Sequence, residues 1–347
     1  MYLRGYPPGI LTQSFSCHKG RDFPYEVRVR ILFLGTPEFA CPSLESLNEG
    51  EEIVGVITQP DRPSGRGRRF AAPAVKRLAE EKGIPLYQPG DVNRDFFINQ
   101  MRRLKPDLVV VVAFGQLLGP NFLSIPRLLT INLHPSLLPC YRGPGPIPWA
   151  IINGERETGV TVQKVEKELD KGGIILQKKV PIDPLETAAD LERELSFLGA
   201  ELLGEAIKLI KRGQIQYRSQ NEAEATYAPK IEKADSLIDW SKPALTIHNL
   251  VRGSNSYPGA STFVRLRGKR MRIKIWRTEL LKENSNLKKD ALVGQIVQIC
   301  KPEGFLVKGG DVPLLVKEVQ LPNRNPISGY DFIKGYQIKK GFILGGS

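Results

Sequence analysis

Two side chains that can take part in catalysis, Asn132 and His134, lie close together in the segment INLHPSLLPCYRGPGPIPW. They are two residues apart, so on a strand they point to the same face of a sheet. Pro135 cannot extend a hydrogen-bonded ladder, which places His134 at the end of that strand with a loop following. We therefore expect an amide and an imidazole together at the rim of a sheet.

Asp170 adds a carboxylate to this pair, in KELDKGG, on a loop between two further predicted strands. An amide N–H can hold a developing oxyanion, an imidazole can move a proton near neutral pH, and a carboxylate can orient that imidazole. No serine or cysteine nucleophile is needed if the attacking group is an amine of the substrate. A single histidine at a strand end is more often structural than catalytic, so from Asn132 and His134 alone both interpretations stay open.

The elements that must position these side chains alternate between strands and helices from Arg28 onward. Runs of apolar residues such as RVRILFLG, IVGVIT and DLVVVVA are separated by helical segments such as CPSLESLNEG. Continuous apolar strands between helices are typical of a parallel sheet covered on both faces. We predict a doubly wound α/β domain over residues 28–213, with a long amphipathic helix over 185–213. Ligands bind such sheets at the carboxyl ends of the strands.

The rest of the chain divides into three predicted parts. Residues 1–27 have no clear period and form a loose extension, which is open to interpretation as a tail, a misread start or an organelle-targeting segment. Residues 214–240 are polar and connecting, so we expect a linker. Over residues 241–347, short strands alternate with Gly-rich turns after one short helix, which indicates a small β-barrel or sandwich.

Several classes of protein and of site are excluded by what the sequence lacks. The first strand ends in GTPEFA, with one glycine where the dinucleotide fingerprint needs three, and no phosphate-binding P-loop motif occurs. No apolar run approaches the ~20 residues of a membrane helix. The four cysteines are scattered, without the spacing of a zinc site or a disulfide framework. We expect no bound metal and no membrane contact.

The charge of the chain is uneven. The net charge is +13, and residues 213–347 hold 22 basic and 12 acidic side chains, so the last third carries most of the excess. A basic face of this kind attracts polyanions, nucleic acid first and an anionic membrane second. Surface lysines that are merely solvated are the alternative explanation.

Two basic clusters stand out. Residues 62–69 carry four arginines interleaved with Pro, Ser and Gly, and we expect a loop too flexible to pack but able to hold phosphates, a solvated loop being the alternative. These arginines are Arg62, Arg66, Arg68 and Arg69. In RLRGKRMRIKIWR, an extended strand would place Arg265, Arg267 and Lys269 on one face. Trp276 in the same segment is better explained as a core aromatic than as a base-stacking one.

Seven segments of the chain, in order, resemble the methionyl-tRNA formyltransferase family. They are FLGTPEFA, VITQPDRPSGRGRRF, VVVAFGQLL, INLHPSLLPCYRGPGPI, ETGVTVQKVEKELDKGGIIL, TYAPKI and IDW. The block N-x-H-P-S-L-L-P-x-Y-R-G with a downstream L-D-x-G is specific for folate-dependent formyl transfer. It is shared with glycinamide ribonucleotide formyltransferase, with formyltetrahydrofolate hydrolase and dehydrogenase, and with sugar-nucleotide formyltransferases. The arginine-rich insertion and the basic C-terminal domain favour the tRNA-acting family.

The resemblance implies a fold and a reaction. The fold is a Rossmann-like formyltransferase domain followed by an OB-like barrel that binds tRNA. The reaction transfers the formyl group of 10-formyltetrahydrofolate to the methionine amine of initiator methionyl-tRNA. Asn132 would stabilise the tetrahedral oxyanion, His134 would serve the proton transfers, and Asp170 would hold His134 charged and order a water. The family's folate-binding stretch matches Ser136, Leu137, Leu138 and Pro139.

The partners and the location follow from the same resemblance. The four clustered arginines would contact the tRNA acceptor stem, and we expect a monomer in the bacterial cytoplasm. An organelle matrix becomes the expected location if residues 1–27 are a targeting peptide. Two rival functions stay open: a related enzyme that formylates a sugar nucleotide or hydrolyses the folate, and an RNA-binding protein on a catalytically inactive fold. The arginine cluster speaks against the first, and the intact Asn132, His134 and Asp170 speak against the second.

Overall fold

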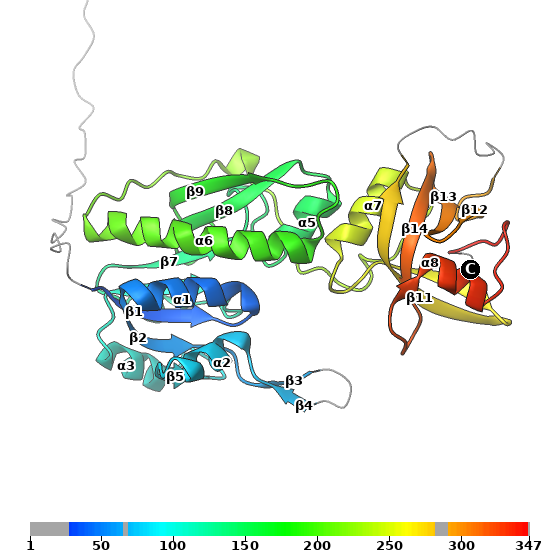
Figure 1. Cartoon of the computed structure of the whole chain (residues 1–347). Coiled ribbons are helices and arrows are strands. Elements are labelled where there is room, and N and C mark those ends of the chain that lie inside the picture. The colour runs from blue at the N-terminus through cyan, green and yellow to red at the C-terminus, as the bar shows by residue number, and fades with distance from the viewer. Residues whose placement is uncertain (1–27, 65–68, 282–290, 346–347) are drawn as a thin grey trace, which may run out of the picture.

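The computed structural model describes residues 28–64, 69–281 and 291–345 and contains two large sheets (Figure 1). The N-terminal sheet has seven strands in the order β5-β2-β1-β6-β7-β8-β9. These strands are β1 (Arg30–Gly35), β2 (Glu52–Ile57), β5 (Leu86–Tyr87), β6 (Leu108–Val112), β7 (Leu129–His134), β8 (Glu157–Lys164) and β9 (Ile174–Pro181).

The first five strands in this order are parallel, and β8 and β9 are antiparallel additions at one edge. The chain runs from β1 outward to β2 and β5 and then returns to the other side of β1 for β6 and β7. This reversal is the topology of a doubly wound fold, in which the carboxyl ends of the strands form the ligand-binding edge. The predicted α/β domain is confirmed.

Helices cover both faces of this sheet, which explains its continuous apolar strands. In β1, Ile31 and Phe33 belong to one core, whereas Leu32 and Leu34 belong to the core on the opposite face. The first core also receives α1 (Cys41–Gly50), α2 (Ala74–Glu81) and α6 (Ala188–Lys211), and the second receives α3 (Asp95–Arg103). Short helices η1 (Glu38–Ala40), α4 (Pro120–Leu123) and α5 (Pro146–Ile152) complete this half.

The long helix α6 braces the strand that carries Asn132 and His134. Its start is fixed by a capping box in which Thr187 and Asp190 satisfy each other's backbone N–H groups. Gly199 faces Leu133 of β7 so closely that a Cβ would lie 2.4 Å from a Leu133 methyl carbon. Because Leu133 points toward α6, its neighbours in the strand point to the opposite face.

The C-terminal part contains a second, antiparallel sheet with the order β10-β11-β14-β13-β12 and with β15 paired to β14. Its elements are α7 (Ala244–Gly253), β10 (Ser261–Leu266), β11 (Lys269–Leu280), β12 (Ile296–Cys300), β13 (Gly304–Lys308), β14 (Pro313–Gln320), β15 (Ile327–Ser328) and α8 (Gly329–Gly335). Among the described strands, β10 and β12 at the two ends of the order do not pair, so the sheet stays open. The OB-like barrel therefore stays a prediction.

Helix α7 joins the two parts through buried polar contacts. Arg252 Nη1 donates to the carbonyl oxygens of Asp183 and Glu186, each at 3.2 Å, and His248 Nε2 lies 3.2 Å from the carbonyl oxygen of Pro184. Gly253 packs against Ile152 of α5, where a Cβ would lie 2.6 Å from that side chain. The segment before α6 and the helix α5 thus form the platform on which α7 rests.

A two-stranded ribbon, β3 (Arg62–Ser64) and β4 (Arg69–Ala71), extends from the N-terminal sheet (Figure 1). The sequence predicts an irregular loop over residues 62–69, and this was wrong for its two ends, which pair in antiparallel register. None of the helices within the described ranges is long and apolar enough to cross a membrane.

Candidate active site

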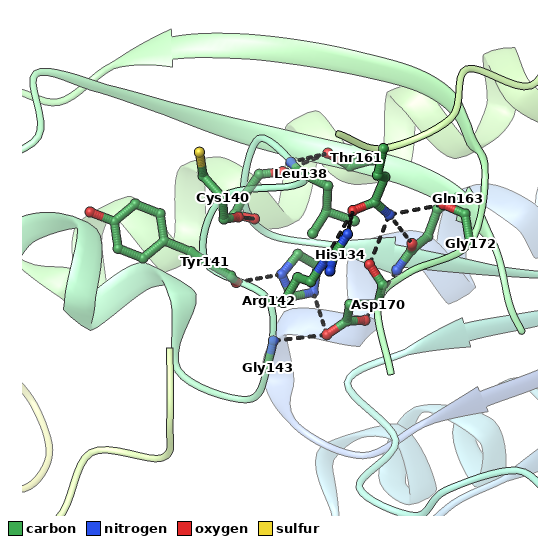
Figure 2. A network of polar contacts seen from close by, with 12 residues as sticks. His134, Leu138, Cys140, Tyr141, Arg142, Gly143, Thr161, Gln163, Asp170 and Gly172 are labelled. Atoms are coloured by element: carbon green, nitrogen blue, oxygen red, sulfur yellow. Dashed lines mark hydrogen bonds and ion pairs between the residues drawn. The ribbon is translucent and has the colours of Figure 1, made fainter. Parts of the chain in front are cut away.

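His134 lies at the carboxyl end of β7, and its contacts fix the tautomer of its ring (Figure 2). Nε2 lies 2.9 Å from the carbonyl oxygen of Tyr141, which can only accept a hydrogen bond, so Nε2 carries a proton. Nδ1 points to Asp170 Oδ2 at 3.7 Å, and both side chains are more than nine-tenths buried. Nδ1 is therefore the ring nitrogen that can gain or lose a proton in the site.

Asp170 is held as a hydrogen-bond acceptor on both carboxylate oxygens. Its Oδ2 accepts the backbone N–H of Gly143 at 2.9 Å, and its Oδ1 accepts Nε2 of Gln163 at 3.1 Å. The 3.7 Å from Oδ2 to Nδ1 of His134 is longer than a hydrogen bond, but it is within the distance of an ion pair with a protonated ring. The arrangement stabilises a positive charge on the imidazole.

Asn132 lies on the same strand face as His134, at the centre of the strand rather than at its end. It is directly opposite Gln163 of β8 in the antiparallel pair, and Gln163 contacts Asp170. The Asn132 amide is half-buried and makes no hydrogen bond to any residue of the described ranges, so it is available to a ligand. The structure brings together the three side chains that the sequence selected.

The stretch Ser136, Leu137, Leu138 and Pro139 follows β7 and is fixed from β8. Thr161 Oγ1 donates to the carbonyl oxygen of Ser136 at 2.6 Å and accepts the backbone N–H of Leu138 at 3.2 Å. Ser136 and Leu138 are buried, whereas Leu137 and Pro139 are half-buried. The side chains of Ser136 and Leu138 thus shape the loop from inside, and contacts to a ligand are left to the other two residues and to the backbone.

A buried arginine holds the loop that follows. Arg142 is fully buried, and its guanidinium binds Glu222 through two bonds, at 2.8 and 3.0 Å, and Gln220 Oε1 through two more. The hydrogen-bonded Glu222 raises the pKa of Arg142 above its ordinary value. The backbone of Arg142 also pairs with Tyr227 of the same downstream segment. The predicted linker is therefore part of the wall of the site.

Two members of the arginine cluster, Arg62 and Arg69, lie apart from this network on the ribbon β3–β4. Arg62 is exposed and donates to Gln59 Oε1 at 3.0 Å, and Arg69 begins β4. Arg66 and Arg68 lie outside the described residues. Beside the ribbon, Asp61 accepts bonds from Gln88 and Lys76, which lower the pKa of that carboxyl.

The predicted basic face of the C-terminal part exists, but with a shifted register. On β11, Arg270 and Arg272 are exposed and Lys274 is half-buried, while Ile273 and Ile275 between them are buried. The shift arises because Arg267 lies in the turn between β10 and β11, with φ of +48°, and so cannot belong to an extended strand face.

Trp276 belongs to this outer row, whereas the sequence favoured a place for it in the core. Its ring lies 4.9 Å from Lys274 Nζ, its Nε1 donates to Gln320 Oε1 at 2.9 Å, and Gly259 packs against its edge. Lys274 and Gln320, which both contact Trp276, line a cavity of about 450 Å³ that is also lined by Lys233 and Arg272. Burial and these two neighbouring cations lower the pKa of Lys274.

Three residues around the site, Arg142, Gln163 and Gln220, were not singled out as functional from the sequence. Gln163 and Gln220 contact the Asp170 loop from a strand and from the predicted linker, and Gln220 is 50 residues distant from Asp170 along the chain. The sequence offered one signal for these contacts, Arg142 in the block L-P-C-Y-R-G, to which the sequence alone assigns no role. A buried arginine needs hydrogen-bond partners, and another segment must supply them.

The chain is similar to known formyl transferases along nearly its whole length. A model of the formyl transferase family matches residues 28–207, and a model of the formyl transferase C-terminal domain matches residues 230–337. The methionyl-tRNA formyltransferase of Geobacter sulfurreducens is 42% identical over 318 residues, which cover 91% of this chain and 97% of that protein. The methionyl-tRNA formyltransferase of Clostridioides difficile is 44% identical over 318 residues, 91% of this chain and all of that protein.

Two solved structures share the fold. HypX from Aquifex aeolicus, in complex with tetrahydrofolic acid, has a TM-score of 0.62 and 21% identity, over 90% of this chain and 48% of that chain. The N-formyltransferase from Helicobacter canadensis, in complex with folinic acid and dTDP-3-aminofucose, has a TM-score of 0.62 and 20% identity, over 85% of this chain and 100% of that chain. Taken with the relatives above 40% identity, the family models show that this chain belongs to the methionyl-tRNA formyltransferase family.

Proposed function

We propose that this enzyme, which formylates methionyl-tRNA, takes its formyl group from 10-formyltetrahydrofolate and acts on the initiator tRNA, with Asn132, His134 and Asp170 as its catalytic residues. One observation carries the proposal. An amide that makes no hydrogen bond to the described residues lies on the same face of β7 as an imidazole with one fixed nitrogen, and a buried carboxylate lies 3.7 Å from that imidazole.

Each of these side chains has one task in the transfer. The methionine amine attacks the formyl carbon, and the oxyanion that develops accepts a hydrogen bond from the amide of Asn132. The attacking nitrogen must lose a proton and the departing folate nitrogen must gain one, and Nδ1 of His134 is the site through which this proton passes. Asp170 stabilises the imidazolium by charge attraction while the ring holds the proton. Its two oxygens accept hydrogen bonds from Gly143 and Gln163, which keep the carboxylate in place beside the ring. The C–N bond to the folate then breaks.

The donor is proposed to bind beside the stretch Ser136, Leu137, Leu138 and Pro139. Two structural neighbours of the chain were solved with tetrahydrofolic acid or folinic acid, which supports a folate co-substrate for this fold. The loop is held rigid, because Gln177 Nε2 donates to both the Leu138 carbonyl oxygen and Thr161 Oγ1. A fixed loop with partly exposed apolar side chains suits a flat pterin ring.

The tRNA is proposed to contact two basic surfaces. One is the arginine cluster Arg62, Arg66, Arg68 and Arg69, of which Arg62 and Arg69 lie on the ribbon β3–β4, and the other is the outer row of β11 with Arg270, Arg272 and Lys274. In this division, residues 28–213 are the catalytic domain, residues 241–347 the tRNA-binding domain, and residues 214–240 connect them. Arginine and lysine rows of this kind bind phosphates without reading sequence.

The role of Asn132 is tested with 10-formyltetrahydrofolate labelled in its formyl group. We expect label to move to methionyl-tRNA, and we expect Asn132→Leu to slow single-turnover transfer by about 10²–10³-fold, because one oxyanion donor is lost. The affinity for tRNA stays the same, since Asn132 lies in the sheet and not on a basic surface. A variant as fast as the native enzyme would remove Asn132 from the mechanism.

A further inference from the structure

We propose that Gln220, in the segment between the two sheets, is a positioning residue for formyl transfer that acts through Asp170. The inference rests on the proposed role of Asp170. Gln220 makes no hydrogen bond to His134 or Asn132. Its side-chain amide donates instead to backbone carbonyl oxygens of the loop that carries Asp170. It therefore governs where the carboxylate lies rather than taking part in the chemistry.

The orientation of the Gln220 amide is fixed by Arg142. A guanidinium can only donate hydrogen bonds, so the atom of Gln220 that faces it must be the oxygen. Oε1 accepts from Arg142 Nε at 3.0 Å and from Nη2 at 2.8 Å. Arg142 itself cannot turn away, because it is fully buried and its remaining donors bind Glu222. The NH2 group of Gln220 consequently points in the opposite direction, toward the Asp170 loop.

That NH2 group meets only acceptors. Nε2 of Gln220 lies 2.8 Å from the carbonyl oxygen of Asp170 and 2.8 Å from that of Gly172, two carbonyls turned toward one point. Asp170 has a φ of +54°, a left-handed conformation that is uncommon outside glycine, so the loop needs support to keep it. Two strong bonds from one amide supply that support.

The same amide also orders the carboxylate of Asp170. Gln220 Nε2 also lies 3.2 Å from Oε1 of Gln163, so one of its two hydrogens is shared between this oxygen and a loop carbonyl, and the NH2 group of Gln163 is left to donate to Asp170 Oδ1 at 3.1 Å. Figure 2 shows Arg142, Gln163, Asp170 and Gly172 converging through these contacts. The bonds run in one direction, from Arg142 through Gln220 and Gln163, and they end on Asp170 Oδ1, while Asp170 Oδ2 lies 3.7 Å from Nδ1 of His134.

The test is a double-mutant cycle in the full-length enzyme. Gln220→Met keeps the length of the side chain but removes both its donor and its acceptor, and Gln216→Met is the control on an exposed neighbour that makes no side-chain hydrogen bond to the described residues. We expect Gln220→Met to lower kcat by about 10–100-fold with KM for tRNA and for the donor unchanged, as for other residues that orient a functional group. In an Asp170→Asn background, the same substitution should change kcat by less than about threefold.

The outcomes separate the two proposals. A full 10–100-fold further loss in the Asp170→Asn background would mean that Gln220 does not act through Asp170, and native kcat in Gln220→Met would also overturn the inference. An Asp170→Asn enzyme with native activity would instead overturn the proposed role of Asp170. Because Gln220→Met can loosen the fold, Gln220→Glu provides a second test, since its carboxylate still pairs with Arg142 but points an oxygen at the two carbonyls. We expect a similar loss in kcat in a variant that still folds, as shown by native circular dichroism and a cooperative thermal transition, and full activity would contradict the inference.

Discussion

At the scale of single residues, the two nitrogens of His134 have separate tasks. Nε2 donates a hydrogen bond to the carbonyl oxygen of Tyr141. Nδ1, which faces Asp170, is therefore the ring nitrogen that can carry a transferable proton. The hydroxyl of Tyr141 is itself removed from proton transfer near neutral pH. Burial and the hydrogen bond to Glu155 raise the pKa of that tyrosine to about 12. The imidazole of His134, which faces Asp170, is therefore the side chain placed to carry the proton.

Replacing His134 by alanine should remove the proton carrier while leaving both basic surfaces intact. We expect the single-turnover rate of formyl transfer to fall by about 10²–10⁴-fold, which is the usual contribution of general acid–base catalysis. The dissociation constant for methionyl-tRNA, measured by filter binding, should stay within about twofold of the native value. A variant that transfers formyl at the native rate would rule His134 out as the proton carrier.

The sequence revealed part of this site for a clear physical reason. Asn132 and His134 could be paired in advance because the period of a strand places residues i and i+2 on one face. The contacts of Gln163, Arg142 and Gln220 could not be predicted, because they depend on which segments meet after folding. Arg142 and Gln220 are 78 residues apart in sequence, and no periodic pattern connects such a pair.

At the scale of elements, the turn that carries Asp170 allows no side chain at the first of its two glycines, Gly172. A Cβ on Gly172 would lie 1.8 Å from the carbonyl oxygen of Lys164, so the backbone must move to accept one. Gly204 in α6 is a matched control, because a Cβ there meets nothing within 4 Å. The two glycines thus separate a steric requirement from the general effect of adding a methyl group.

Gly172→Ala should therefore lower the free energy of unfolding, by about 1–3 kcal/mol, and reduce formyl transfer because Asp170 is displaced. Gly204→Ala should raise the free energy of unfolding by up to about 1 kcal/mol and leave the rate unchanged, since alanine favours a helix. Urea unfolding and single-turnover kinetics on both variants test this. Equal stability of the two variants would show that the turn tolerates a side chain.

The ribbon β3–β4 is the second element with a separable role. Replacing Arg62, Arg66, Arg68 and Arg69 together by alanine should weaken tRNA binding and make it less dependent on salt, because each lost phosphate contact flattens the plot of log K against log[salt] by up to about 0.9. The ribbon lies outside the network of His134 and Asp170, so the rate at saturating tRNA should change little. An unchanged salt slope would assign these arginines to bulk solvent.

The elements themselves were largely predictable, and their pairing was not. The helix predicted over residues 41–50 is α1 without any change of bounds, because proline near its start and glycine at its end mark both termini. Helix α5, Pro146–Ile152, was missed because it lies in a segment rich in proline and glycine that reads as a loop. The open order of the C-terminal sheet depends on contacts between strands, which the turn pattern does not define.

At the scale of the whole molecule, the two sheets meet through α7, and a histidine is buried where they meet. His248 Nδ1 lies 2.9 Å from Thr278 Oγ1 of β11, and its Nε2 lies 3.2 Å from the Pro184 carbonyl oxygen. Burial lowers the pKa of His248 below its ordinary value of 6.5. The neutral ring is therefore the form that fits between the two parts.

This buried ring makes stability depend on pH in one direction. As the pH falls below 6.5, the unfolded chain takes up a proton on His248 before the folded chain does, so the free energy of unfolding decreases until the pH passes the lowered pKa of the folded state. His248→Gln has no such proton and should lose less stability between about pH 7.5 and about pH 5.5. Urea unfolding at both pH values measures this, and identical pH dependence in the two proteins would contradict it.

The central claim concerns the whole enzyme: three converging side chains pass a formyl group from a folate to the amine of methionine on the initiator tRNA. The direct measurement incubates the purified full-length protein with 10-formyltetrahydrofolate, labelled in its formyl carbon, and with methionine-charged initiator or elongator tRNA. We predict that label appears on the initiator tRNA alone and that its rate of appearance falls strongly, but stays measurable, in Asp170→Asn. Label on both tRNAs, on neither, or at the native rate in Asp170→Asn would contradict this account.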